Sequence, residues 1–507
     1  MSSETSTIGD PFADPIAEVT RTEPITETTL IVGRNATLTL GTDSLIVLDE
    51  GFAKERGFRC CDLLPSNSKN TRPIPFHNVL WANISEPGLT IWFAQQTSKD
   101  FVQPTFISYS VEKTNSLAAR TWISKLLDRS YSKSQRQKRI KVLINPFGGK
   151  GNAQKLYSRD IEPIFTAAQS VIDVERTQYR GHAVEIAENL DIEAYDVVAC
   201  CSGDGLPHEI FNGLGNRKDA RKALSKVAIV QLPCGTGNAM SWNLNGTNSP
   251  SLAALYVVKG IRTPLDLVSI TQTNRRFLSF LSQSVGIVAE SDLATEHLRW
   301  MGENRFTYGI LVRLLRKTVY PCDLAVKVTV EDKQTIRQHY RQELDNRELV
   351  SSRRAQLAAT ESANNGLPPL KFGTVGDELP EGWELVPYDT LGNFYAGNMA
   401  WMAANANFFP AALPNDGNID LVCIDGHISR ITALKSIAAV ESGAFYDMEH
   451  VSYRKVEGFR IIPRDQKNGY ISIDGEKVPF EPFQAEIHRG LGTVLSKSGH
   501  IYEAPGV

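Results

Sequence analysis

Residues 140–152 read Ile-Lys-Val-Leu-Ile-Asn-Pro-Phe-Gly-Gly-Lys-Gly-Asn, an apolar run that ends in a glycine-rich turn. The run predicts a buried strand, and Leu156, Ile161 and Phe165 predict that a helix follows the turn. Glycines allow backbone N–H groups to converge on an anion, and Lys150 adds a positive charge. The stretch matches neither GxxxxGK[ST] nor GxGxxG, and taken alone it also fits an ordinary turn.

Two more glycine-rich turns follow at the ends of later predicted strands. Residues 202–205 (Ser-Gly-Asp-Gly) follow the apolar run 196–201, and residues 233–238 (Pro-Cys-Gly-Thr-Gly-Asn) follow the run 227–232. Strands that alternate with helices indicate a parallel sheet covered by helices, which binds ligands at the carboxyl ends of its strands. A single SGDG turn reads as a helix cap, whereas three such turns in one unit favour a shared nucleotide site.

The second half of the chain has a different pattern. From about Asp266 short β-type runs dominate, and they predict an antiparallel β-sandwich over 266–500 that follows an α/β domain over 138–265. Helices are expected at about 292–301, 305–317 and 430–440. Residues 332–387 are charged and polar, so we expect a mobile, partly helical insertion in which few apolar positions reach a core.

The first 130 residues form two parts. Residues 1–26 are rich in Ser, Thr, Glu and Pro and are expected to be disordered. Residues 27–130 contain several β-type runs and a closing amphipathic helix from about Ser116 to Leu127. This β-rich extension fits a small barrel of pleckstrin-homology type and equally fits an irregular extension of the next domain.

Composition narrows the functional classes. Of the 507 residues, 42% are hydrophobic and 22% charged, as in an ordinary globular protein. A formal net charge of −3 gives no reason to expect nucleic-acid binding. The seven cysteines include no CxxC pair and the nine histidines show no metal-ligand spacing, so no protein-built metal site is expected. The sequence shows no secretion signal and no run of roughly 20 apolar residues, so we expect a cytoplasmic protein.

The three turns resemble the signature blocks of the diacylglycerol-kinase-type catalytic domain, a superfamily that includes the NAD kinases. The matching stretches are NPFGGKGNA (145–153), SGDGLPHEIFNGL (202–214) and LPCGTGNA (232–239). The chain more narrowly resembles sphingosine (long-chain-base) kinases, because residues 282–309 are similar to their lipid-binding segment and residues 470–477 to their C-terminal end. Residues 57–65 and 73–84 are similar to the N-terminal part of fungal members.

The resemblance implies roles for individual residues. Asp204 would be the catalytic base that takes the proton of the substrate hydroxyl, and ATP and Mg²⁺ would be the cofactors. The residues implied to bind ATP are Asn145, Gly148, Gly149, Lys150, Thr177, Ser202, Gly203, Gly205, Glu209, Gly235, Thr236, Gly237, Asn238, Arg299, Arg305, Asp474 and Glu476. The residues implied to bind the lipid head group are Asp292, Ser282 and Glu296.

The implied activity is phosphorylation of a sphingoid base at its primary hydroxyl. Asp292 and Glu296 lie on one face of a predicted helix, where a carboxylate would face the protonated amine of such a base. A ceramide or diacylglycerol kinase and a non-catalytic lipid- or nucleotide-binding regulator remain as alternatives.

Membrane association is expected to be peripheral. The adjacent Cys60 and Cys61 are a candidate palmitoylation site, with ordinary buried cysteines as the alternative. The sequence makes no prediction of the preferred sphingoid base, the organelle or the oligomeric state.

Overall fold

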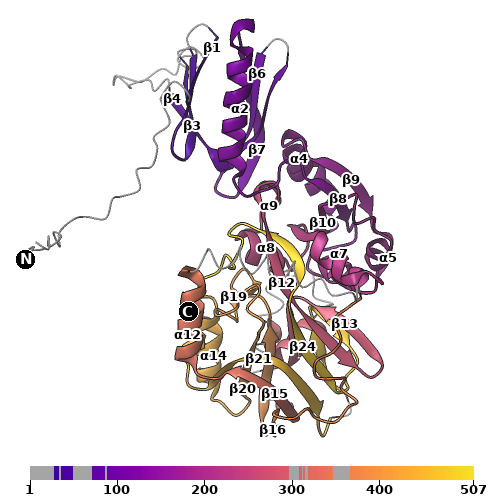
Figure 1. Cartoon of the computed structure of the whole chain (residues 1–507). Helices are drawn as coiled ribbons and strands as arrows, with labels where there is room; N and C mark the ends of the chain where they lie inside the picture. Colours follow the sequence, from indigo (N-terminus) through magenta and orange to yellow (C-terminus); the bar gives the residue numbers. More distant parts are fainter. Residues whose placement is uncertain are drawn as a thin grey trace, which may run out of the picture. The chain divides into compact units, whose positions relative to one another are not determined.

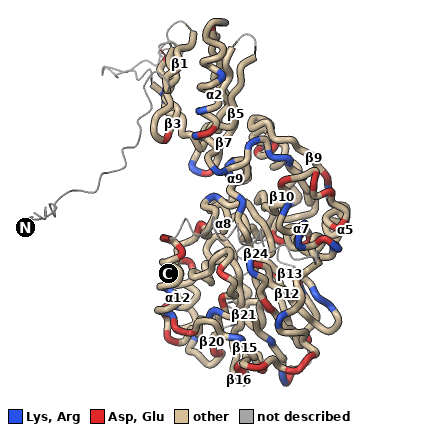
Figure 2. Tube along the Cα trace, in the orientation of Figure 1, with Lys and Arg blue, Asp and Glu red and all other residues tan. Residues whose placement is uncertain are grey.

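The computed structural model describes residues 28–33, 36–49, 71–85, 88–295, 308–310, 312–313, 318–345, 366–466 and 468–507. The chain forms two compact units, and each is described by itself. The first comprises Met1–Ile91 and Ile107–Ser130, and the second comprises Trp92–Phe106 and Tyr131–Val507. Acidic and basic residues are interspersed along both (Figure 2). None of the helices among the described residues has the length and apolar character needed to cross a bilayer.

Two small antiparallel sheets and one helix form the N-terminal part. A four-stranded sheet has the order β1-β2-β3-β4, and a three-stranded sheet has the order β5-β6-β7. Alternate residues of β2 are buried, as expected where one face of a sheet is covered. The bounds are β1 (Thr29–Val32), β2 (Ala36–Leu40), β3 (Ser44–Asp49), β4 (Thr71–Pro75), β5 (Val79–Ser85), β6 (Gly88–Ser98), β7 (Phe101–Ser110) and α2 (Ser116–Tyr131). The pleckstrin-homology-like assignment stays a prediction, and residues 1–26 lie outside the described residues.

The catalytic half contains the predicted parallel sheet (Figure 1). Its strands lie in the order β9-β8-β10-β11, and neighbouring strands are parallel. The strand bounds are β8 (Arg139–Ile144), β9 (Val171–Arg176), β10 (Val197–Ser202) and β11 (Ala228–Pro233). The helix bounds are α3 (Ala153–Leu156), α4 (Glu162–Ala167), α5 (His182–Glu188), α6 (Gly205–Gly215), α7 (Ala220–Lys226), α8 (Ala239–Asn245) and α9 (Pro250–Lys259), with a π-helical turn η4 at Tyr157–Ile161.

The C-terminal half is antiparallel, as predicted, and it continues the same sheet. β24 pairs in parallel with β11 and antiparallel with both β12 and β21. The strand bounds are β12 (Ile261–Gln272), β13 (Arg275–Ser279), β14 (Ser282–Gly286), β15 (Cys322–Val330), β16 (Glu384–Tyr388), β17 (Leu391–Gly397), β18 (Trp401–Ala403), β19 (Ala406–Asn407), β20 (Ile419–Asp425), β21 (Val451–Pro463), β22 (Ile471–Ile473), β23 (Glu476–Val478) and β24 (Phe483–Ser496). The helix bounds are α10 (Ile287–Ala294), α12 (Lys333–Asp345) and α14 (Arg430–Val440).

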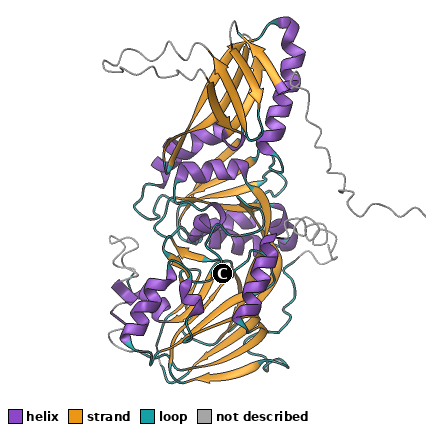
Figure 3. Ribbon diagram, turned by 90° about the vertical axis from the view of Figure 1, so that its left-hand side faces the viewer, coloured by secondary structure: helices purple, strands orange, loops and turns teal. Residues whose placement is uncertain are grey.

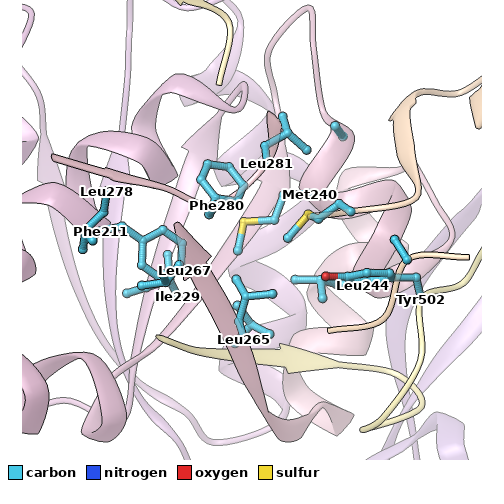
Figure 4. Packing of buried hydrophobic residues seen from close by; sticks show 14 of the residues in the cluster. Phe211, Ile229, Met240, Leu244, Leu265, Leu267, Leu278, Phe280, Leu281 and Tyr502 are labelled. Carbon is cyan, nitrogen blue, oxygen red and sulfur yellow. The ribbon is translucent and has the colours of Figure 1, made fainter. Parts of the chain in front are cut away.

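Two hydrophobic clusters hold the second unit together. The larger one joins the helices of the catalytic half to the C-terminal strands, and Figure 4 shows Phe211 and Ile229 beside Leu267 and Leu278. The smaller one collects the inner faces of the antiparallel strands, including Phe394 and Phe459. Figure 3 shows these strands as curved layers with helices beside them. A core that crosses from one half to the other fixes the two halves against each other.

The described parts of the predicted insertion at 332–387 are anchored to the rest of the second unit. In its described parts apolar side chains do reach the core: Ile336 and Tyr340 of α12 are buried, and so is Trp383. The backbone of residues 371–377 is also bound, because Glu486 accepts hydrogen bonds from Lys371 N–H (2.9 Å) and Phe372 N–H (3.0 Å). Few apolar side chains of the described parts reach the core, but they are large and well placed, so they anchor these parts. The mobility of the insertion as a whole stays a prediction.

Replacing Trp383 with alanine should lower the free energy of unfolding by about 3 kcal/mol, because a buried indole that packs edge-on against Phe372 leaves a cavity. Chemical denaturation measures the loss. Leu385→Ala, at an exposed position of β16, is the control and should cost less than about 1 kcal/mol. An equal, small effect of both variants would support the mobile insertion instead.

Candidate functional site

Three glycine-rich turns meet at the carboxyl edge of the parallel strands. A Cβ atom added to Gly235 would lie 2.2 Å from the backbone nitrogen of Gly203, and one added to Gly203 would lie 2.7 Å from the carbonyl oxygen of Gly237. Gly149, at φ +57°, joins the same contact, because its Cβ would lie 3.1 Å from the backbone of Gly235. A side chain at any of these positions would push the turns apart, so the contact requires glycine.

Asp204 lies where the second and third turns touch. Its Oδ2 accepts a hydrogen bond from the backbone N–H of Ala239 (2.9 Å), and its Oδ1 accepts one from the backbone N–H of Met240 (3.0 Å). Both donors belong to the first turn of α8, and the side chain caps no N–H of α6, the helix that Asp204 precedes. Asp204 therefore caps α8, whereas the sequence suggests that it caps the helix that directly follows it, α6.

The surroundings of Asp204 raise its proton affinity. Burial raises the pKa of this carboxyl, the hydrogen bonds from Met240, Ala239 and Gln231 lower it, and the charge of Asp474 raises it further. The net direction is upward. A carboxylate with a raised pKa accepts a proton from an alcohol more readily, which suits a general base.

Gln231 is a site residue that the sequence analysis missed. Its Nε2 donates a hydrogen bond to Oδ1 of Asp204 (3.1 Å), and its Oε1 accepts one from the backbone N–H of Ser241 (2.9 Å). The side chain is 1% exposed, so this geometry is enclosed by protein. A signal was present, since Gln231 is the one polar residue in the apolar run 227–232.

One cavity of about 670 Å³ runs from the glycine turns into the C-terminal half. It collects most of the predicted site residues: Asn145, Gly148, Gly149, Thr177, Ser202, Gly203, Asp204, Gly205, Glu209, Gly235, Thr236, Gly237, Ser282, Asp292, Asp474 and Glu476. Predicted ATP-binding and lipid-binding residues thus line a single space.

Other predicted residues lie elsewhere. Lys150 is exposed and does not line the cavity. Asn238 is buried beside the third turn and holds it, since its Oδ1 accepts a hydrogen bond from Gly235 N–H (3.2 Å). Five predicted residues lie outside the described residues, namely Glu296, Arg299, Arg305, Cys60 and Cys61.

Asp474 organises the wall of the cavity. Its Oδ1 accepts hydrogen bonds from Ser279 Oγ (2.6 Å) and from the backbone N–H groups of Leu281 and Ser282 (both 2.9 Å). Its Oδ2 accepts one from Phe280 N–H (3.0 Å) and lies 2.8 Å from His208 Nδ1. With both oxygens occupied, Asp474 positions the segment 279–282, and its predicted contact with ATP stays a prediction.

His208 connects this wall to the helix that follows Asp204. Burial lowers the pKa of His208, but the hydrogen bond to Asp474 together with the charges of Asp474, Glu476 and Glu209 outweighs burial, so the net shift is upward. In the sequence His208 lies within the stretch 202–214, where no local pattern gives it a role. The structure shows it as the partner of a carboxylate 266 residues away.

Two further predicted acids have protein partners. Glu209 accepts hydrogen bonds from the backbone N–H groups of Gly181 and Ala183 (both 3.2 Å) and so caps the start of α5. Glu476 pairs with Arg180, which also lines the cavity. Arg180 therefore adds a positive charge beside the glycine-rich turns, and the sequence did not indicate this residue.

In the C-terminal half the cavity lining includes the carboxylate of Asp292 and several apolar side chains. Asp292 lines it, with Ser472 Oγ 3.5 Å from its Oδ2. Burial raises the pKa of the nearby Tyr395, and the charges of Asp292, Asp474 and Asp204 raise it further. The same cavity is also lined by the apolar side chains Val288, Leu293, Ile310, Met402, Phe408, Ile437 and Val440. A second cavity of about 90 Å³ shares Phe408 and Ile437 with the first.

The carboxylates bear on how the implied magnesium ion would be held. Oδ1 of Asp474 accepts three hydrogen bonds from protein donors, whereas each oxygen of Glu209 accepts one. Oδ2 of Asp204 accepts one hydrogen bond from the described residues. Asp204 and Glu209 would therefore be the carboxylates that could hold Mg²⁺, which would supply positive charge to the phosphates of ATP.

Comparisons with known proteins agree with this geometry. Residues 139–270 match the family model of the diacylglycerol kinase catalytic domain, and residues 28–132 match a domain of unknown function, DUF7493. A presumed diacylglycerol kinase from Bacillus anthracis shares the fold, with a TM-score of 0.50 at 16% identity over 72% of this chain and 98% of its own.

Three relatives with names are more similar in sequence. Sphingoid long chain base kinase 5 of Saccharomyces cerevisiae is 36% identical over 75% of this chain, which spans 62% of that protein. Sphingoid long chain base kinase 4 of Schizosaccharomyces pombe is 34% identical over 85% of this chain and 90% of its own. Sphingosine kinase 1 of Rattus norvegicus is 30% identical over 71% of this chain and 91% of its own.

Replacing Gly203 with alanine should weaken ATP binding by about tenfold or more, because the added Cβ would lie 2.7 Å from the carbonyl oxygen of Gly237. Isothermal titration with a non-hydrolysable ATP analogue measures the change. Gly205→Ala is the matched control in the same turn, since its Cβ would meet its nearest neighbour at an ordinary 3.4 Å. Equal affinities of both variants would show that close contact of the turns is not needed for the nucleotide.

Proposed function

The chain belongs to the sphingoid long chain base kinase family, and on that premise we propose that it transfers the γ-phosphoryl group of ATP to the primary hydroxyl of a sphingoid base. One observation carries the proposal. A single cavity is lined by the glycine turns, Asp204, Asp292 and a set of apolar side chains. A kinase acting on a lipid with a charged head needs a phosphate site, a base, a head-group site and a tail site within one space.

The glycine turns and Arg180 form the nucleotide end. Phosphoryl transfer depends mainly on positioning and on neutralising charge, so backbone N–H groups that approach the phosphates closely are effective. The absence of Cβ atoms at Gly203 and Gly235 allows that approach. Mg²⁺, carried by ATP, would neutralise further charge on the phosphates.

Asp204 acts as the general base. The substrate O–H donates its proton to the carboxylate as the hydroxyl oxygen bonds to the γ-phosphorus, and the bond between that phosphorus and the β–γ bridging oxygen breaks. The products are the lipid 1-phosphate, ADP and a proton on Asp204 that later passes to water. Oδ2 is the better placed acceptor, because it takes one hydrogen bond from the described residues whereas Oδ1 takes two.

Asp292 recognises the head group. A sphingoid base carries a protonated amine beside its reactive hydroxyl, and a carboxylate in the cavity wall would bind that amine by a charge-assisted hydrogen bond. Ceramide and diacylglycerol carry no such charge. The same residue therefore distinguishes a sphingoid-base kinase from the alternative lipid kinases, and turnover itself distinguishes it from a non-catalytic regulator.

We further propose that the protein acts in the cytoplasm and meets intracellular membranes peripherally. Its substrate is an amphiphile that partitions into bilayers, so the enzyme has to collect it at a lipid surface. Acylation of Cys60 and Cys61, outside the described residues, remains a separate proposal.

Asp204→Asn should reduce kcat about 10²–10⁴-fold while ATP affinity stays near that of the parent, because only the proton acceptor is lost. Radiolabelled phosphoryl transfer to detergent-dispersed sphinganine measures kcat. Turnover within a few-fold of the parent would mean that another group is the base.

Gln231→Met tests the role of Asp204 as the base through its pKa. Losing the donor to Oδ1 should raise the pKa of Asp204, so the acid limb of the kcat/KM profile should move to higher pH. The sign follows because the base must be deprotonated, and a higher pKa delays deprotonation as pH rises. An unshifted limb would mean that Gln231 is only structural.

Asp292→Asn should raise KM for sphinganine by about 10- to 100-fold and leave KM for ATP nearly unchanged. Asp389→Asn is the control, because the Asp389 side chain is 80% exposed and pairs with Arg464. The parent should discriminate against ceramide in the same assay. Equal turnover of ceramide and sphinganine would contradict recognition of the amine.

A further inference from the structure

α14 presents an apolar ridge to solvent. Ser429 caps the helix, since its Oγ accepts a hydrogen bond from Thr432 N–H (3.0 Å), and Ala433, Ser436 and Val440 face the interior. On the opposite side Ile431 is 69% exposed and Leu434 is 48% exposed. Two large apolar side chains that are exposed one turn apart on a helix form an apolar patch, which indicates a binding surface.

The ridge leads to the mouth of the active-site cavity. Ile431, Leu434 and Ala438 are spaced i, i+3 and i+7, which places them along one face of a helix. Ala438 and Glu441 are exposed and also line the cavity, so the cavity opens beside them. Asn405, between β18 and β19, is likewise exposed and lines it. Figure 1 shows α14 at the periphery of the second unit.

The inner side of α14 covers the tail end of the site. Ile437 and Val440 line both the large cavity and the smaller one. A single helix thus has one face on the space that would hold the lipid tail and the other face in solvent. Whatever binds the outer face lies one helix diameter from the substrate.

Basic residues flank the ridge. Arg430 and Lys435 lie on either side of it and are exposed, and no acidic residue occurs within α14. The acidic Glu441 follows at the rim of the cavity. An apolar face with basic flanks is the pattern of helices that rest in the interface of an anionic bilayer.

We propose that the α14 ridge, Ile431 and Leu434 with Arg430 and Lys435, docks on an anionic lipid bilayer and holds the cavity mouth against it. A lipid surface is favoured over a protein partner because the ridge is continuous with a cavity that takes a membrane lipid. A tail passing from the bilayer along Ala438 into the cavity avoids contact with water. This inference rests on the proposed function.

The test uses the full chain produced in bacteria, so that acylation of Cys60 and Cys61 does not contribute. Sedimentation with phosphatidylcholine vesicles, with and without phosphatidylserine, measures docking. Ile431→Ser/Leu434→Ser should bind phosphatidylserine vesicles about tenfold more weakly than the parent. Val171→Ser/Val174→Ser is the control, because these side chains of β9 are similarly exposed, at 62% and 39%, and lie outside the cavity lining.

Charge is tested separately from apolar contact. Lys435→Gln should weaken binding to vesicles with phosphatidylserine about fivefold and leave the weaker binding to phosphatidylcholine alone unchanged. The ridge variant should keep the parent's kcat on detergent-dispersed sphinganine, because neither Ile431 nor Leu434 lines the cavity. With sphinganine presented in vesicles its apparent KM should rise in proportion to the loss of binding.

Vesicle binding of the ridge variant equal to that of the parent would overturn the proposal. So would a comparable loss of activity in detergent, which would place the ridge in the substrate site. A parent dimer that the ridge variant disrupts, without a change in vesicle binding, would assign the surface to a second copy of the chain. Failure of the parent to phosphorylate detergent-dispersed sphinganine would overturn the proposed function itself, whatever the vesicles show.

Discussion

The contact between the backbones of three glycine-rich turns is the constraint on which the rest of the site depends. It requires β8, β10 and β11 to run parallel and side by side, because only then do their carboxyl ends meet at one edge. It also brings the start of α8 to Asp204, which lies in the second turn. The fold of the catalytic half and the geometry of the base are therefore two results of one packing requirement.

The fold of the catalytic half could be predicted from the sequence because it is determined by residues that are close together along the chain. Each turn lies between a strand and a helix that are its neighbours along the chain, and glycine marks the positions where backbones touch. Asp474 shows where this reasoning ends. Its role depends on residues 279–282 and on His208, which are distant in sequence, and no local pattern reports that all of them converge on one carboxylate.

The anchoring of the insertion at 332–387 could not be predicted for a related reason. A polar composition describes the average of a segment, whereas burial is decided by single side chains such as Trp383. The backbone around Lys371 is held by Glu486, a partner more than a hundred residues later. The apolar end of the cavity was hidden in the same way, since Ile437 and Phe408 have the spacing of ordinary core residues and only the fold shows that they line a space.

The position of β24 affects how the enzyme forms. This strand bonds to β11, β12 and β21, so a segment that is synthesised long after β11 lies at the centre of the sheet. A chain still attached to the ribosome has its glycine turns long before it has the strand beside β11 or the carboxylate of Asp474 that shapes the cavity wall. The apolar faces that β24 covers stay open during that interval, and contacts between such distant segments form slowly. During synthesis of this kinase the three glycine-rich turns are therefore made long before the strand and the carboxylate that complete the site around them.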